Sequence, residues 1–197
     1  DELIVIDIDA TMNGREPDYT LIKNLAAECN MPLCYGGCVT STEQIDRIIS
    51  LGVEKVAMSS TVLSNPAVVS RTAEIVGGQS VVAVMDVKKS RFRGRYELYT
   101  HNGTQKTGVT PVDFARRAQD LGAGEIVINS IDRDGMMQGY DLELVETVRN
   151  VVTLPITVLG GAGSLSDIGQ LIDSYEIIGA AAGSLFVFKG VYRAVLI

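Results

Sequence analysis

Two stretches of the chain, MPLCYGGCVTSTEQI at residues 31–45 and LPITVLGGAGSLSDI at residues 154–168, share one pattern. Each has a proline, then a short apolar run, a pair of glycines and a polar segment with helical spacing. An apolar run that ends in glycine and leads into an amphipathic segment is typical of a β-strand followed by an α-helix. The two stretches therefore predict the same βα unit at two places in the chain.

The repeat extends on both sides of these stretches. DELIVIDIDAT at residues 1–11 aligns with GEIVINSIDRDG at residues 124–135, and DYTLI at residues 18–22 aligns with DLELV at residues 141–145. Agreement across several successive elements is difficult to obtain by chance, and repeated supersecondary units are a strong indication of architecture. We infer that the chain contains a duplicated half-barrel of four βα units.

Short runs of branched aliphatic residues alternate with amphipathic segments throughout the chain. The runs predict seven strands, at Leu3–Ile8, Leu33–Tyr35, Lys55–Met58, Val81–Met85, Glu125–Asn129, Ile156–Leu159 and Ile177–Ala182. Helices are predicted at Tyr19–Glu28, Thr42–Leu51, Val112–Leu121 and Leu142–Asn150, with starts near Asp18, Ser41, Pro111 and Asp141. Only Ser90–Thr107 breaks the alternation, and it predicts a hairpin with a turn at Asn102-Gly103.

Apolar strands separated by helices predict a parallel sheet that is covered on both faces. We predict an α/β fold: a single (β/α)8 TIM barrel domain over residues 1–197, built from two half-barrels. The second half has four strands and the first half has three, so we expect the first βα unit to be absent from this sequence and to precede residue 1.

Composition narrows the classes of function. Apolar residues make up 46% and aromatic residues 6% of the chain, which is typical of a soluble protein with an aliphatic core. The net charge of −7 argues against nucleic acid or a membrane as a partner, and we see neither a membrane span nor a signal peptide. Three clustered cysteines, Cys29, Cys34 and Cys38, predict a reducing cytoplasm, and no metal site or cofactor is expected.

The repeat predicts two phosphate-binding sites at the mouth of the barrel. Glycine lets the backbone approach a ligand closely, and serine at a helix start offers a hydroxyl and N–H groups to an anion. We name these sets the first cradle (Gly36, Gly37, Ser59 and Ser60) and the second cradle (Gly160, Gly161, Gly183 and Ser184). Their matched spacing suits a ligand with a phosphate at each end, although an ordinary tight turn remains the alternative for each Gly-Gly pair.

Carboxylates lie between the two cradles in this arrangement. Asp86 ends the apolar run VVAVMD, Asp7 and Asp9 end the first strand, and Asp132 and Asp134 follow the fifth strand. A carboxylate at a barrel mouth can act as a general acid or base when burial raises its pKa. Loop caps and ion pairs are the alternatives for these acids. His101, the only histidine, is expected to be exposed in the hairpin.

The motif SIDRDG followed by GYD, together with GGAG and DIDAT, resembles the cyclase subunit of imidazole glycerol phosphate synthase. The resemblance covers the whole chain and implies a (β/α)8 barrel of two half-barrels. It implies an enzyme of histidine biosynthesis, a lyase-type cyclase, with a glutaminase as its partner subunit. Ammonia from the glutaminase would react with a bis-phosphorylated ribulosyl carboxamide to give imidazole glycerol phosphate and an aminoimidazole carboxamide ribotide.

The resemblance also assigns roles to residues. It implies that Asp86 is a general acid/base, and that Asp134 and Gly135 line the site near one phosphate. That phosphate would be bound by Gly160, Gly161, Gly183 and Ser184, and the other phosphate by Gly37, Ser59 and Ser60. It further implies that Glu2, Lys55 and Glu125 belong to a charged ring through which ammonia enters the bottom of the barrel, and their positions at strand starts favour that face.

Three residues depart from the family pattern: Cys38 replaces a third glycine, Leu159 replaces a serine and Asn129 replaces a threonine. The segments PLCYGG, LGGAGSL, AAGSLFVF and RAVLI resemble a side branch associated with amidation of surface-polysaccharide sugars (WbuZ-like), in which the barrel supplies ammonia to a separate enzyme. Two further alternatives remain: the phosphoribosyl isomerase of the same pathway, and another phosphosugar barrel.

Overall fold

The computed structural model describes residues 1–90, 94–189 and 194–195. Its main sheet contains seven parallel strands in the order β1-β2-β3-β4-β7-β8-β9. Their bounds are β1 Leu3–Ile6, β2 Leu33–Gly36, β3 Lys55–Met58, β4 Val81–Lys89, β7 Glu125–Ser130, β8 Ile156–Leu159 and β9 Gly179–Ala180. The sheet curls, and the predicted (β/α)8-type architecture is confirmed.

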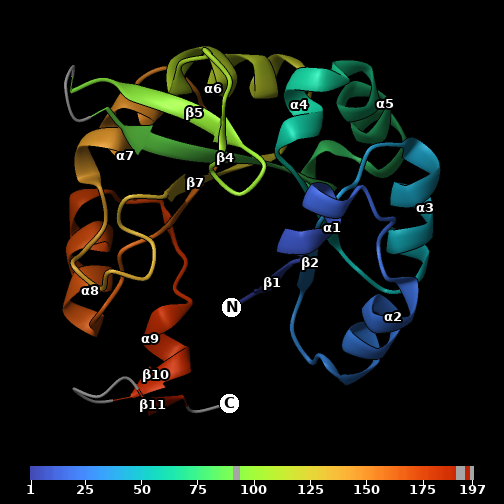
Figure 1. Cartoon of the computed structure of the whole chain (residues 1–197), viewed down its shortest axis with the longest axis horizontal. Helices are drawn as coiled ribbons and strands as arrows, with labels where there is room; N and C mark the ends of the chain where they lie inside the picture. Colours follow the sequence, from blue (N-terminus) through green and yellow to red (C-terminus); the bar gives the residue numbers. More distant parts are fainter. Residues whose placement is uncertain (91–93, 190–193, 196–197) are drawn as a thin grey trace.

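Helices surround the outside of the curled sheet, as Figure 1 shows for α3, α5, α6, α7 and α8. The bounds are α1 Ile8–Asn13, α2 Tyr19–Glu28, α3 Thr42–Ser50, α4 Ser60–Ser64, α5 Pro66–Val76, α6 Pro111–Asp120, α7 Leu142–Arg149, α8 Leu165–Ser174 and α9 Ser184–Val187. Three predicted helix starts are N-caps: Asp18, Ser41 and Asp141 each accept backbone N–H bonds. The fourth predicted start, Pro111, is the first residue of α6, whose N-cap is Thr110.

Alternation along the strands divides the buried residues into two sets. The larger set packs between the sheet and its helices, with Tyr35, Met58, Met85 and Phe114 among its members. The smaller set faces the inside of the curl and comprises Cys34, Ala57, Val82 and Val127, with Ile4, Val84 and Leu159 packed against it. Side chains alternate between the two faces of a strand, so every second residue faces the inside of the curl. At the C-terminal ends of the strands, where the active sites of barrels lie, these inward-facing residues can take part in chemistry.

Three predicted strand boundaries were wrong. The first strand ends at Ile6 because the Asp7 carboxylate accepts hydrogen bonds from the N–H groups of Asp9 and Ala10 and so starts α1. Asp7 and Asp9 therefore do not end a strand. The fourth strand continues to Lys89, because its end pairs with the hairpin strand β5 (Tyr96–Thr100). The seventh strand is reduced to β9.

The predicted hairpin is present: β5 pairs with β6 (Gln105–Lys106) across the turn at Asn102-Gly103, while residues 91–93 lie outside the described residues. A short antiparallel pair, β10 (Phe188–Lys189) and β11 (Ala194–Val195), follows α9. The segment RAVLI at residues 193–197 lies mostly outside the described part. Within the described residues β1 and β9 are the edges of the parallel sheet, and the eighth strand stays a prediction.

Candidate active site

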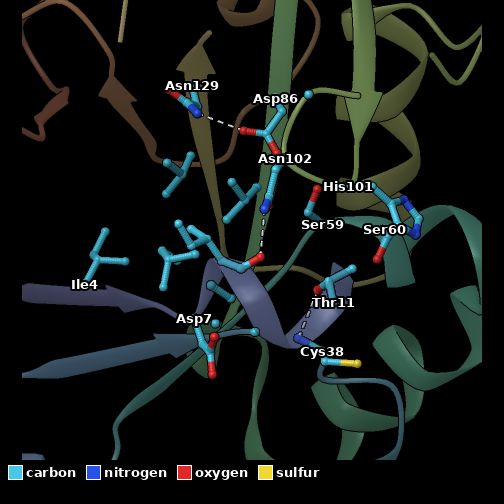
Figure 2. A pocket seen from close by; sticks show the side chains of 18 of the residues that line it. Ile4, Asp7, Thr11, Cys38, Ser59, Ser60, Asp86, His101, Asn102 and Asn129 are labelled. Carbon is cyan, nitrogen blue, oxygen red and sulfur yellow. Dashed lines mark hydrogen bonds between the residues drawn. The ribbon is translucent and has the colours of Figure 1, made fainter. Parts of the chain in front are cut away.

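A pocket of about 390 Å³ opens where the parallel strands end (Figure 2). The residues after β1, β2 and β3 line one side of it, and the ends of β4 and β7 line the other. Apolar side chains of the inner set, such as Ile4, Val84 and Val127, form its floor, while polar groups line its upper part. A mostly apolar pocket with a few converging polar groups is the usual form of a small-molecule site.

Asp86 is the carboxylate that β4 delivers into this pocket. It lies on the same strand face as Val82 and Val84, so the parity of the strand points it inward. Burial raises the pKa of Asp86, a hydrogen bond from Asn129 opposes that rise, and the charge of Asp134 adds to it. The Asn129 Nδ2 donates to Asp86 Oδ1 at 2.8 Å (Figure 2), which fixes the orientation of the carboxyl group.

The first cradle lies in this pocket. Gly37, Ser59 and Ser60 all line it, and the Ser59 side chain makes no capping bond to α4. Gly37 has φ +149°, and a Cβ added there would be 2.7 Å from the Asp7 Cβ, so this position requires glycine. Cys38 keeps a left-handed φ of 47° although it is not glycine, and its N–H donates to Thr11 Oγ1 at 3.2 Å. The Cys38 N–H is thus already engaged by α1.

The second cradle lies across the sheet from the first, since α4 and α9, which begin at Ser60 and Ser184, stand on opposite sides in Figure 1. A Cβ added to Gly135 would be 3.9 Å from Ser184 Oγ, so these two residues are neighbours. Asp134 lines the main pocket, whereas the lining among the described residues does not include Gly135, Gly160, Gly161, Gly183 and Ser184. The first cradle therefore lines the same pocket as Asp86 and Asp134. The second cradle lies outside this lining, next to Gly135.

The Gly-Gly pair of the second cradle has a packing role as well. Gly139 donates its N–H to the Gly161 carbonyl at 2.8 Å, and a Cβ on Gly161 would be only 2.1 Å from the Gly139 carbonyl oxygen. The Tyr140 hydroxyl donates to the Ala181 carbonyl at 2.9 Å and joins the same loop to the segment before Gly183. The loop that contains SIDRDG is thereby fastened to the ends of β8 and β9.

Three charged residues meet at the opposite end of the inner set. Lys55 Nζ donates to Glu2 Oε2 at 2.6 Å and to Glu125 Oε2 at 2.8 Å, while the Thr157 hydroxyl donates to Glu125 Oε1 at 2.7 Å. Partial burial acts to lower the pKa of Lys55, but the hydrogen bonds and charges of the two glutamates raise it overall. We call this cluster the bottom triad (Glu2, Lys55 and Glu125), and its members were predicted to share this face.

Cys34 lies just above the bottom triad. Burial raises the pKa of its thiol to about 12, and the charges of Glu2 and Glu125 contribute to that rise. The thiol therefore stays protonated and acts as a small apolar group in the inner set. Together with Ala57, Val82 and Val127 it separates the triad from the pocket that contains Asp86.

His101 was expected to be exposed, and this was wrong: it is half-buried and lines the pocket together with Asn102 and Gly103. The Asn102 Nδ2 donates to the carbonyl of Ile8 at 2.8 Å, which brings the hairpin turn against α1 (Figure 2). No local sequence pattern predicts this contact between residues far apart in the chain. Asp132 accepts a hydrogen bond from the N–H of Lys89 at 2.8 Å, which is a structural role.

The part of the chain that the structure describes contains no cluster of three or more His, Cys, Asp or Glu side chains arranged as metal ligands. None of its helices is both long and apolar enough to cross a membrane. Cys29, Cys34 and Cys38 are all free thiols.

Comparison with known proteins identifies the family. A profile described as "Histidine biosynthesis protein" matches residues 1–193. The chain is 54% identical over its full length to the "Putative imidazole glycerol phosphate synthase subunit HisF" of Leptospira interrogans, of which it covers 78%. It is 53% identical over its full length to the "Putative imidazole glycerol phosphate synthase subunit hisF3" of Vibrio vulnificus (strain YJ016), covering 76% of it.

A third relative is the "Imidazole glycerol phosphate synthase subunit HisF" of Alkaliphilus metalliredigens (strain QYMF), which is 39% identical over 97% of the chain and 75% of that protein. The family model and the relatives agree with the resemblance carried by the motifs SIDRDG and GGAG. The chain therefore belongs to the histidine biosynthesis protein family, and within it to the group named HisF.

Proposed function

We propose that this chain is the cyclase subunit of an imidazole glycerol phosphate synthase. It would combine ammonia with a bis-phosphorylated ribulosyl carboxamide and release imidazole glycerol phosphate and an aminoimidazole carboxamide ribotide. The observation that carries the proposal is the position of Asp86, an inward-facing carboxyl group with a raised pKa in the same pocket as Gly37, Ser59 and Ser60. Membership of the family supports this reaction class.

Asp86 would move protons during ring closure. Its raised pKa brings both protonation states of the carboxyl group closer in free energy at neutral pH, which is what a general acid/base needs. The ionised form can take a proton from the attacking nitrogen, and the protonated form can give a proton to a departing oxygen. Asn129 positions the carboxyl group through its 2.8 Å hydrogen bond.

The phosphates would orient the substrate across the mouth. Gly37, Ser59 and Ser60 would bind one phosphate, and Gly160, Gly161, Gly183 and Ser184 would bind the other with Gly135 beside them. Ser60 begins α4 and Ser184 begins α9, and these helices lie on opposite sides of the sheet. This arrangement supports a ligand with a phosphate at each end. Asp134 would face the middle of such a ligand, since it lines the pocket with Asp86.

Ammonia would enter from a glutaminase subunit bound at the bottom triad. The side chains between the triad and the pocket are small or apolar, which suits neutral ammonia better than ammonium. The relatives are named as subunits, which supports a partner chain. We place the complex in the cytoplasm, in agreement with the three free thiols.

A second candidate is ammonia supply to a separate enzyme that amidates surface-polysaccharide sugars. It is favoured by the residues that depart from the family pattern at the mouth, because Cys38, Asn129 and Leu159 all line the pocket where substrate would bind. In this alternative the bottom triad still admits ammonia, whereas Asp86 no longer acts as a general acid/base. The phosphoribosyl isomerase alternative is disfavoured because it has no use for the bottom triad.

The test is an assay of the purified protein with ammonium chloride and the bis-phosphorylated ribulosyl carboxamide. We expect both products to form in equal amounts, and Asp86→Asn to abolish their formation. A protein that binds a glutaminase and stimulates glutamine hydrolysis, yet forms neither product, would contradict the cyclase proposal and support the sugar-amidation alternative.

A further inference from the structure

The turn between β5 and β6 lies at the mouth of the pocket, and three successive residues in it have left-handed backbone conformations. His101, Asn102 and Gly103 have φ values of 51°, 53° and 72°, so two consecutive residues with side chains are left-handed. Positive φ at Asn102-Gly103 is usual for a tight hairpin turn, and histidine is among the residues enriched in the left-handed region, so the turn places His101 at a defined position.

Side-chain hydrogen bonds fasten this turn in place. Asn102 Nδ2 donates to the Ile8 carbonyl of α1 at 2.8 Å, and Lys88 Nζ of β4 donates to the Gly103 carbonyl at 3.1 Å. The Thr104 hydroxyl donates to the His101 carbonyl at 2.6 Å, and His101 Nδ1 lies 3.1 Å from Thr100 Oγ1. The turn is thus attached to both sides of the mouth, and the imidazole is oriented through Nδ1, which leaves Nε2 for a ligand.

The charges of the pocket lining make the position of this imidazole important. Three acidic residues, Asp7, Asp86 and Asp134, line the pocket, and the Asp7 carboxylate is engaged as the N-cap of α1. No lysine or arginine lines the pocket among the described residues. A phosphate placed there meets negative charge on several sides. His101 is the one described lining residue whose side chain can carry a positive charge.

We propose that His101 is a phosphate-binding and specificity-determining residue of this site. Its Nε2–H donates to the phosphate bound by Ser59 and Ser60, which line the same pocket (Figure 2). A charge-assisted hydrogen bond to phosphate is stronger than a neutral one and offsets the nearby carboxylates. The inference rests on the proposed function for the identity of the substrate, but the binding of a phosphate group can be measured without turnover.

The sequence offers a direct probe, because His101 is the only histidine and its ring signals need no assignment. We would titrate the purified protein with inorganic phosphate and follow the imidazole nitrogen shifts by NMR. We expect saturable shifts in the wild-type protein and at least tenfold weaker apparent binding in Ser60→Ala. Ser184→Ala, in the second cradle, is the matched control and should leave the titration at His101 unchanged.

The substitution to make at the histidine itself is His101→Asn. Asparagine tolerates the left-handed conformation, so this variant keeps the turn while it removes the imidazole. We expect phosphate to bind the first cradle about tenfold more weakly by calorimetry, which corresponds to ~1.4 kcal/mol. In turnover we expect KM to rise with a smaller change in kcat, because a group that binds a remote phosphate acts in substrate and transition state alike.

Two results would overturn the proposal. One is an imidazole spectrum that stays unchanged while phosphate saturates the first cradle; the other is wild-type phosphate affinity in His101→Asn. Failure of the proposed function is distinguishable from both. A protein that binds phosphate through His101 and forms neither cyclase product retains this site and loses only the assigned reaction.

Discussion

The two ends of the inner surface contain similar residues in opposite electrostatic situations. At the bottom, Glu2 and Glu125 share Lys55, and each described charge has a partner within 2.8 Å. At the mouth, burial and the charge of Asp134 both raise the pKa of Asp86, and neither carboxylate has a cation within salt-bridge distance among the described residues. The charges at the bottom are paired with one another, whereas the acidic side chains at the mouth have no cationic partner among the described residues.

The two ends of the inner surface thus differ in how far their charges are paired. The bottom triad has one positive and two negative side chains, and all three are paired without a ligand. At the mouth, burial of the unpaired Asp86 carboxylate costs stability in the free protein, as is common at functional sites. If the two ends are independent, a substitution at one end should leave the properties of the other end unchanged.

Asp86→Asn should remove most of the activity while it stabilises the protein. Loss of a general acid/base lowers kcat by about 10²–10⁴-fold. Because the pKa of Asp86 is raised in the folded state, the wild-type protein loses stability as pH rises through that pKa, and asparagine does not. We expect a higher melting temperature for the variant at pH 7, with the difference shrinking as pH approaches 3.8. Equal melting temperatures across that range would contradict the burial argument.

Gly37→Ala should damage the mouth more than Gly183→Ala does. A Cβ at Gly37 would be 2.7 Å from the Asp7 Cβ and 3.0 Å from its carbonyl, so α1 must shift. Overpacking of this kind costs about 1–3 kcal/mol. Gly183 has no heavy atom within 4 Å of an added Cβ, so its variant should unfold at the wild-type denaturant midpoint. Urea unfolding of both variants measures the difference in their free energies of unfolding. Similar midpoints would show that a Cβ at Gly37 fits beside Asp7 without a shift of α1.

Lys55→Met should destabilise the bottom without affecting phosphate binding at the mouth. It leaves two glutamates facing each other, but the Lys55 side chain is 25% exposed, so solvent screens much of the repulsion. We expect a loss of about 1–2 kcal/mol, less than for a fully buried pair. Urea unfolding gives the loss, and a titration of His101 with phosphate should match the wild type. A weaker phosphate affinity would show that the two ends are coupled.

Asn129→Leu should raise the pKa of Asp86 further, because the hydrogen bond from Asn129 acts to lower it. The acidic limb of the pH–kcat profile should move to higher pH, whereas Asn129→Thr should move it less, since a hydroxyl can still donate to the carboxylate. This is the smallest effect, a change of a few-fold in kcat below neutral pH. Identical profiles for the leucine and wild-type proteins would remove Asn129 as a positioning residue.

Much of the architecture follows from periodicity, because strands and helices here bury complementary faces. The Gly-Gly repeat predicts the βα units, and the apolar run before Asp86 predicts that an acid faces the mouth. The N-cap role of Asp7 was not predicted. Hydrogen bonds from the N–H groups of Asp9 and Ala10 to its carboxylate compete with extension of the strand. The placement of His101 was missed because it depends on the contact between Asn102 and Ile8.

The most direct test of the account is product formation from two nitrogen sources in three proteins. The wild type, Asp86→Asn and Lys55→Met are each supplied with the bis-phosphorylated ribulosyl carboxamide, together with either ammonium chloride or glutamine and a glutaminase subunit. The proposed function predicts that Asp86→Asn loses both reactions, whereas Lys55→Met keeps the ammonium reaction and changes the glutamine reaction. Product formation by Asp86→Asn at the wild-type rate from either source would contradict it.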